Sequence, residues 1–130
     1  MSPFPLVLGL TLCEKAIVEE GTKNVTLVST FSKLTVHDLP SPPQRFILYT
    51  VLREGRGEGI IDLVIRNLET NAEVFSLQMP VHFPDPVMEV RVLLRINRCV
   101  FPAAGEHLCI LLLDGEWLGQ RRLRVVKKEE

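Results

Sequence analysis

Apolar and polar side chains alternate with a period of two residues along almost the whole chain, and this pattern restricts the fold more than any other feature. The clearest run places Phe75, Leu77, Met79, Val81 and Phe83 on one side, with mostly polar residues between them. A strand points successive side chains to opposite faces, whereas a helix repeats every 3.6 residues. A helical repeat is almost absent. The chain is therefore predicted to be all-β.

Turn signals divide the chain into about eight predicted strands. Segments rich in proline, glycine, asparagine or aspartate recur roughly every 8 to 14 residues, a spacing typical of sandwiches and barrels. The predicted strands cover residues 6–18, 25–36, 45–53, 61–66, 74–83, 88–100, 107–113 and 118–126. The apolar phase slips within the second of these strands, which predicts a bulge. We predict a two-layer antiparallel β-sandwich that forms one domain over residues 1–126, followed by a charged tail over 127–130.

The charge balance and the cysteines predict the compartment and exclude some partners. Fifteen basic and sixteen acidic residues give a formal net charge of −1, so no global field attracts nucleic acid or an anionic membrane. The apolar run over residues 5–12 is shorter than the ~20 residues that span a bilayer, and no Lys or Arg precedes it. Three cysteines without CxxC spacing favour a reducing compartment. We expect a cytoplasmic protein with no nucleic-acid or membrane partner.

No motif predicts catalysis or cofactor binding. His37-Asp38 and His82 with Asp85 each offer only two groups, whereas a metal site needs three or four. Cys13 precedes Glu14, but nothing in the sequence places a histidine beside the thiol to activate it. We therefore predict no catalytic, cofactor-binding or metal-binding residues, and a protein that is not an enzyme.

Arginines gather in two of the predicted strands. Arg91 and Arg95 share one strand face, and Arg122 and Arg124 share another, because both spacings are even. If the two strands are neighbours, these side chains form a basic strip for a phosphate-bearing or acidic partner. The alternative is an ordinary solvated face that nearby glutamates neutralise.

Three predicted strands are apolar on both faces: residues 6–10, 46–52 and 108–113. One sandwich has a single interior, so the second face of each strand needs another cover. A second protein chain or the proline-rich connector over residues 39–43 could supply that cover, and a large apolar patch marks an interaction site. The candidate interface residues are Tyr49, Leu111, Ile47 and Val51.

Two stretches carry distinctive patterns: Cys13-Glu14-Lys15-Ala16 followed by residues 25–31, and Phe101 followed by Gly105-Glu106-His107 and a strand that Asp114-Gly115 closes. Together they resemble an uncharacterised bacterial family of small proteins. The resemblance implies a β-sandwich and a bacterial origin, and brings no activity. The segment over residues 104–109 also resembles the immunoglobulin-type corner, with His107 at the tyrosine position. That resemblance implies an immunoglobulin-like topology.

The leading functional hypothesis is a non-enzymatic protein-interaction or scaffold module. The strands that are apolar on both faces motivate this hypothesis, and they predict a homodimer or a complex with another protein. The alternative is a small-molecule or peptide binder that uses a sandwich edge or cavity. An unrecognised hydrolase is a third possibility, which a pocket lined by converging titratable groups would favour.

Overall fold

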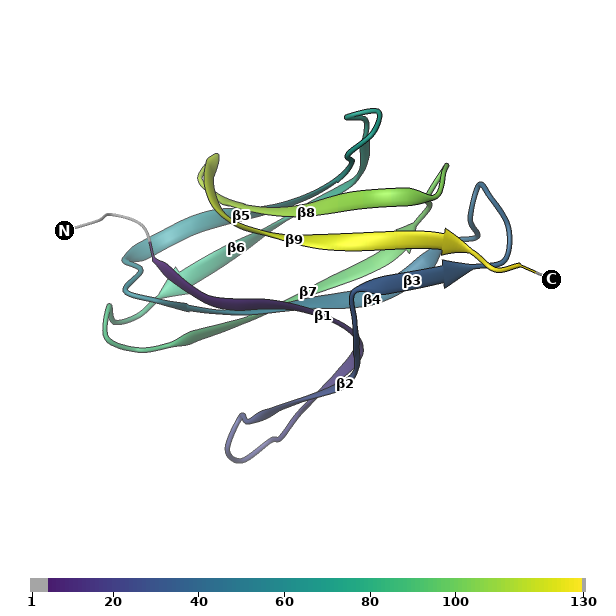
Figure 1. The fold of residues 1–130 in the computed structure, drawn as a ribbon. Coiled ribbons are helices and arrows are strands. Elements are labelled where there is room, and N and C mark those ends of the chain that lie inside the picture. Colours follow the sequence, from purple (N-terminus) through teal and green to yellow (C-terminus); the bar gives the residue numbers. More distant parts are fainter. Residues whose placement is uncertain (1–4, 130) are drawn as a thin grey trace.

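The computed structural model describes residues 5–129, and within them every regular element is a β-strand (Figure 1). The nine strands are β1 (Leu6–Val18), β2 (Val25–Phe31), β3 (Lys33–Val36), β4 (Gln44–Arg53), β5 (Gly57–Asn67), β6 (Glu73–Phe83), β7 (Val90–Cys99), β8 (Gly105–Leu113) and β9 (Glu116–Lys127). Over the same residues there is no helix of the length and apolarity that a membrane crossing requires. The all-β prediction is confirmed.

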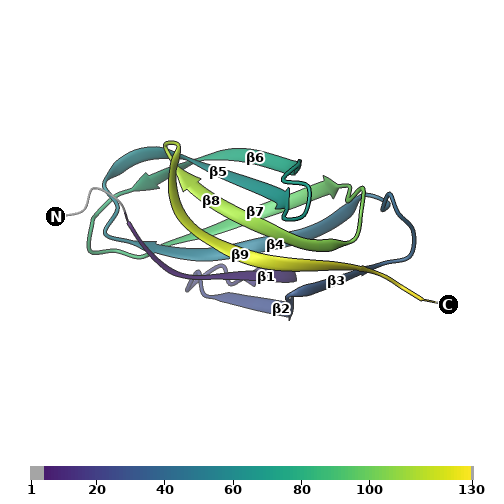
Figure 2. The same cartoon turned by 45° about the horizontal axis from the view of Figure 1, so that its top comes forward.

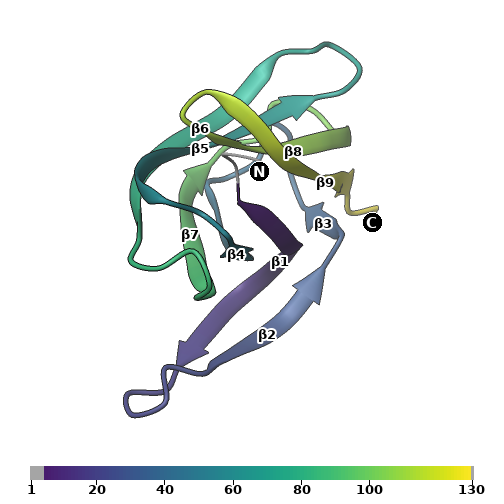
Figure 3. The same ribbon diagram turned by 90° about the vertical axis from the view of Figure 1, so that its left-hand side faces the viewer.

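The strands form two sheets that lie one above the other (Figures 1 and 2). The four-stranded sheet has the order β2-β1-β4-β7, and the five-stranded sheet has the order β3-β9-β8-β5-β6. We call the face of each sheet that points away from the other sheet its outer face. The arrangement resembles a sandwich, as predicted, although the four-stranded sheet is strongly curled (Figure 3).

The predicted strand over residues 25–36 is in fact two strands in different sheets. It breaks at Ser32, between β2 in the four-stranded sheet and β3 in the five-stranded sheet. Ser29 has a φ of 56°, so the predicted irregularity lies just before the break. Because β3 pairs with β9 in parallel, the prediction of a purely antiparallel sandwich with about eight strands is corrected to a mixed arrangement of nine.

The core lies between the two sheets and follows the period-two pattern. In β7, Val92, Leu94 and Ile96 are buried, as the predicted orientation of that strand requires. Leu63 and Ile65 of β5 approach the core from the other sheet and are fully buried. Burying a side chain of this size contributes about 1.5–3 kcal/mol, so the inward positions supply most of the stability.

The predicted hairpin turn at Asp114-Gly115 is confirmed and joins β8 to β9. Both residues have positive φ, 49° and 83°, as the tight two-residue hairpin turn demands. The Asp114 carboxylate also accepts a hydrogen bond of 2.9 Å from the backbone N–H of Ile60. The turn is therefore held against the start of β5.

The outermost strand of the five-stranded sheet contains a proline. Strand β6 pairs with β5 alone, and Pro80 lies opposite Ile60 in that ladder. Proline has no N–H to donate, so it is tolerated in a sheet at an edge. The position of Pro80 is consistent with the place of β6 at the edge.

The β1–β2 hairpin curls beneath the four-stranded sheet, on the side away from the five-stranded one (Figures 1 and 3). Its tip reaches the start of β7, where an Arg91 Nη donates a hydrogen bond of 2.7 Å to the carbonyl oxygen of Lys23. The hairpin tip therefore lies beside the start of β7, whereas a second chain or the proline-rich connector was the cover that we predicted for the outer face of β4. The connector packs elsewhere, since Ser41 and Phe101 exchange two hydrogen bonds of 2.9 Å.

The division into a domain over residues 1–126 and a tail over 127–130 stays a prediction. Strand β9 extends to Lys127, so it includes the first residue of the predicted tail. Residues 1–4 and 130 lie outside the part of the chain that the structure describes.

Candidate functional site

Three of the four predicted interface residues lie together on the outer face of β4. Ile47, Tyr49 and Val51 alternate along the strand with core residues such as Leu48. Tyr49 and Val51 are half-buried, whereas only 5% of Ile47 is exposed. Ile47 lies opposite Cys13 of β1, which is also buried. The predicted apolar face therefore exists, and its Ile47 end is already covered.

The fourth predicted interface residue, Leu111, lies in the core. Its side chain is fully buried, so it offers no surface for a contact. In β8 the inward positions include Cys109 and Leu111, while Ile110 and Leu112 point outward and are half-buried. Alternation could not identify the inward face of this strand, because its two faces are equally apolar.

The structure does not bring the four predicted arginines together. Arg91 and Arg95 lie on β7 in the four-stranded sheet, while Arg122 and Arg124 lie on β9 in the five-stranded sheet. All four are exposed. The predicted basic strip required β7 and β9 to be neighbours, and they belong to opposite layers. The strip is therefore two separate pairs.

One of these pairs lies beside the predicted interface residues. Arg95 is the cross-strand neighbour of Ile47, and Arg91 is the neighbour of Val51. Between these two rows, Leu93 lies opposite Tyr49. The apolar interface residues and the arginine pair, which we predicted independently from the sequence, therefore lie together on the outer side of β4 and β7.

This surface carries a single sign of charge. Strands β4 and β7 contain five charged residues, and all five are arginines: Arg45, Arg53, Arg91, Arg95 and Arg98. By alternation, four of them point to the outer side, and three of these, Arg53, Arg91 and Arg95, lie beside the half-buried residues Tyr49, Val51 and Leu93. We call this surface the arginine face and define it as Tyr49, Val51, Arg53, Arg91, Leu93 and Arg95.

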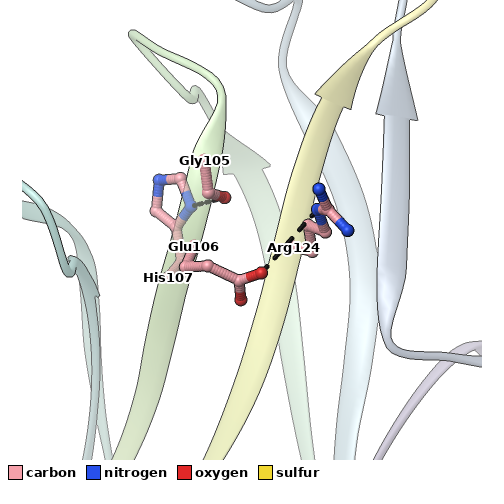
Figure 4. Close-up of polar contacts among 4 residues, drawn as sticks. All are labelled: Gly105, Glu106, His107 and Arg124. Carbon is pink, nitrogen blue, oxygen red and sulfur yellow. Dashed lines mark hydrogen bonds and ion pairs between the residues drawn. The ribbon is translucent and has the colours of Figure 1, made fainter.

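The five-stranded sheet has a mixed charge pattern by comparison. Arg124 of β9 forms an ion pair of 3.7 Å with Glu106 on β8 (Figure 4). His82 of β6 lies 3.8 Å from Glu58 of β5. Both contacts lie on this sheet. An anion approaching it meets carboxylates as well as cations.

A groove of about 470 Å³ separates the hairpin from the start of β7. On the hairpin side it is lined by Val18, Lys23 and Val25. On the β7 side, Arg91 and Leu93 of the arginine face line it, together with Met88 and Glu89. The groove was missed by sequence reasoning, because its walls come from strands at opposite edges of one sheet. The phase slip near Ser29 was the only signal of the curl.

The candidate nucleophiles lie in the interior. Cys13, Cys99 and Cys109 are free thiols and all are buried. Burial raises the pKa of the Cys13 thiol, and it raises the pKa of Cys99 and of Cys109 to about 12. A thiol held protonated in this way is a poor nucleophile and acts as a small apolar side chain.

The two histidine–aspartate pairs lie at the surface. His37 and Asp38 line a shallow depression with the C-terminal residues 127–129. His82 is exposed beside Glu58. Over residues 5–129, no group of three His, Cys, Asp or Glu side chains is arranged to hold a metal ion.

His107 is buried in the core and is held in its neutral form. One ring nitrogen, Nδ1, lies 3.0 Å from the carbonyl oxygen of Gly105 (Figure 4), and the ring packs edge-on against Phe101 at 5.0 Å. The other nitrogen, Nε2, is buried without a partner among the described residues. Burial lowers the pKa of His107, although the Gly105 contact and the charges of Glu106 and Glu69 oppose that shift.

We expect acid to destabilise the protein through His107. The unfolded state binds a proton below its pKa of about 6.5, while the folded state resists protonation because its pKa is lower. Stability is therefore full above pH ~6.5 and falls below it, by about 1.4 kcal/mol for each unit between the two pKa values. Urea unfolding at pH 7.5 and at pH 5.0 measures how far the free energy of unfolding falls between them. This fall should be smaller for His107→Gln than for the wild type. The exposed His82→Gln variant should match the wild type, and an unchanged loss in His107→Gln would contradict this account.

The model of a family of unknown function (DUF6941) matches residues 8–126. This range contains every strand in full except β1, which begins two residues earlier, and β9, which ends one residue later. The chain belongs to this family. The function of the family is unknown, as the predicted resemblance to an uncharacterised family implied. Among curated proteins, no match is found.

A solved structure resembles the chain across nearly its full length. It is described as Pseudomonas fluorescens alkylpurine DNA glycosylase AlkC bound to DNA containing an abasic site analog. The TM-score is 0.50 at 11% sequence identity, and the match covers 96% of this chain. It covers 31% of the glycosylase, so this member of the family spans about a third of that protein. At this identity the likeness shows the fold alone.

The partner prediction from the sequence is wrong. It named a homodimer or another protein and excluded nucleic acid, on the ground that the net charge is −1. A protein with a similar fold over part of its chain is bound to DNA. The net charge was not a sufficient ground for that exclusion, because it averages over the surface, while a contact depends on local charge.

Proposed function

We propose that the chain is a non-enzymatic nucleic-acid-binding module, and that its contact surface is the arginine face. The observation that carries this proposal is the charge of β4 and β7, whose charged residues are all arginines. Phosphate contacts from Arg and Lys supply most of the affinity in sequence-independent binding. Two neighbouring strands whose charged residues are all cationic are suited to such contacts.

The arrangement of the face also suits a phosphate backbone. Arg91 and Arg95 are four residues apart on one strand, which places them about 13 Å apart along it at ~3.3 Å per residue. Tyr49 and Leu93 lie in the row between them. A half-buried tyrosine flanked by arginines gives a base an apolar ring to stack on while its phosphates meet positive charge.

The DNA-bound glycosylase supports the proposal at the level of the fold. Its matched part, about a third of that protein, has the architecture of this chain. Fold alone does not imply function. The arginines of this chain are the main support for nucleic-acid binding, and the glycosylase shows that a protein with a similar fold can bind DNA.

The proposal that the module is not an enzyme is supported by the positions of the reactive groups. Cys99, Cys109 and His107 are buried between the sheets, and Cys13 is fully buried although it lies beside Ile47, near the arginine face. The free cysteines also support a reducing compartment, and a cytoplasmic location is part of the proposal. The immunoglobulin-like topology and the bacterial origin stay predictions.

Binding should be weak, general and steeply dependent on salt. In fluorescence anisotropy with a labelled single-stranded DNA, we expect a Kd of about 10⁻⁵ M, in the range of non-specific binding. If three arginines each neutralise one phosphate, log K should fall with log[NaCl] at a slope of about −2. No anisotropy change up to ~10⁻⁴ M protein, or binding that ignores salt, would reject the proposal.

A further inference from the structure

We propose that the groove between the β1–β2 hairpin and β7 holds single-stranded nucleic acid, with the hairpin as one wall and the Arg91 end of the arginine face in the other. This inference rests on the proposed function and deepens it, because it specifies the form of nucleic acid. It also gives a role to residues 14–30 of the hairpin, which contribute no side chain to the hydrophobic core.

The two walls of the groove differ in chemistry. The hairpin wall presents Val18 and Val25, which are cross-strand neighbours and so share one face of the hairpin. The β7 wall presents Arg91 and Leu93. A base has two flat apolar faces and a phosphate has negative charge, so a groove with aliphatic side chains on one side and an arginine on the other matches both parts of a nucleotide.

The hairpin tip is positioned by the same arginine that lines the groove. The guanidinium of Arg91 donates to the Lys23 carbonyl, which holds the tip beside β7, and Lys23 itself lines the groove. The guanidinium has five N–H donors, so this hydrogen bond leaves others for a phosphate. Two cations thus lie at one end of the groove.

The size of the groove favours a single strand over a duplex. A volume of about 470 Å³ lies within the ~300–1,000 Å³ range of pockets that enclose small ligands, which suits a nucleotide. The bases of a duplex are paired and stacked, so they cannot enter a groove of this kind. A single strand can turn its bases outward and stack them on protein side chains.

One groove residue opposes an anion. Glu89 lies on the β7 side, next to the arginine-rich strand. Its carboxylate repels phosphate, so replacing it should strengthen binding. We expect Glu89→Gln to tighten the binding of single-stranded DNA about threefold, in contrast to every substitution that blocks the groove.

Blocking the groove should remove the preference for single strands. The probes are a labelled oligothymidylate of about 12 nucleotides and a labelled duplex of the same length. Val18→Trp places a bulky ring in the groove, and 42% of Val18 is exposed, so the fold should accept it. Ile17→Trp is the matched control, since Ile17 is the adjacent residue, is 54% exposed and points to the opposite face of the hairpin.

We expect the wild type to bind the single strand at least tenfold more tightly than the duplex. Val18→Trp should lose that preference, while Ile17→Trp should keep it. Val25→Trp provides a second blocking variant, and thermal unfolding checks that each variant folds. Salt-dependent binding of single strand and duplex with equal affinity, unaffected by Val18→Trp and Val25→Trp, would overturn the groove inference and leave the proposed function standing. Binding of neither probe would reject both.

Discussion

Val92→Asp should unfold the protein or leave it with little of its stability. The Val92 side chain points into the core from β7 and is 3% exposed. An ionised carboxylate there has no cation to pair with, because the neighbouring inward residues Leu94 and Thr50 are uncharged. An uncompensated buried charge costs about 3–5 kcal/mol, whereas a domain of this kind is stable by about 5–15 kcal/mol. Urea denaturation followed by far-UV circular dichroism measures the loss.

The control is the same substitution on the other face of the same strand. Arg95 is exposed and outward-facing, so Arg95→Asp should change the free energy of unfolding by less than about 1 kcal/mol. Equal losses for the two variants would show that β7 does not have the orientation described here.

Reversing the charge of Arg91 and Arg95 should reduce nucleic-acid affinity about 100-fold, or ~2.7 kcal/mol. The double variant Arg91→Glu/Arg95→Glu removes two of the three cations of the arginine face and puts carboxylates in their place. Each lost phosphate contact should also lower the salt slope by about one unit. Anisotropy titrations with single-stranded DNA at several NaCl concentrations measure both effects.

The other half of the predicted basic strip provides the matched control. Arg122→Glu/Arg124→Glu changes the net charge by the same amount and also replaces two arginines of one strand, but on the five-stranded sheet. We expect the affinity of this variant for single-stranded DNA to fall less than about threefold, because only the overall electrostatic field of the protein changes. If the two double variants lose affinity equally, binding follows net charge and the arginine face has no special role.

The strands themselves could be predicted because their alternation is unambiguous where one face is polar. In β7, arginines at 91 and 95 alternate with Val92 and Leu94, so the sequence identified both the strand and its inward face. In β8, the run over residues 108–113 has no polar position, and Leu111 was assigned to the wrong side. An apolar run is enough to identify a strand, but only its polar positions show which face of the strand points away from the core.

The candidate site required information that no local pattern contains. Whether Arg91 and Arg122 lie together depends on which sheet each strand joins, and β7 and β9 join different sheets. The groove depends on the path of the chain beyond Cys13 and before Phe31, where the hairpin leaves the plane of its sheet and returns to Arg91. A hydrogen bond between residues 23 and 91 is a long-range property, and the sequence marks neither partner.

Pro80 has a consequence for the behaviour of the protein in concentrated solution. An edge strand exposes a row of backbone donors and acceptors that can template the addition of another chain, which is the first step of edge-to-edge aggregation. Strand β6 is such an edge over eleven residues, and Pro80 removes one of its donors toward the C-terminal end. The rigid ring also obstructs a second strand that tries to align there. We therefore expect that this proline helps to keep the five-stranded sheet from growing into a larger assembly.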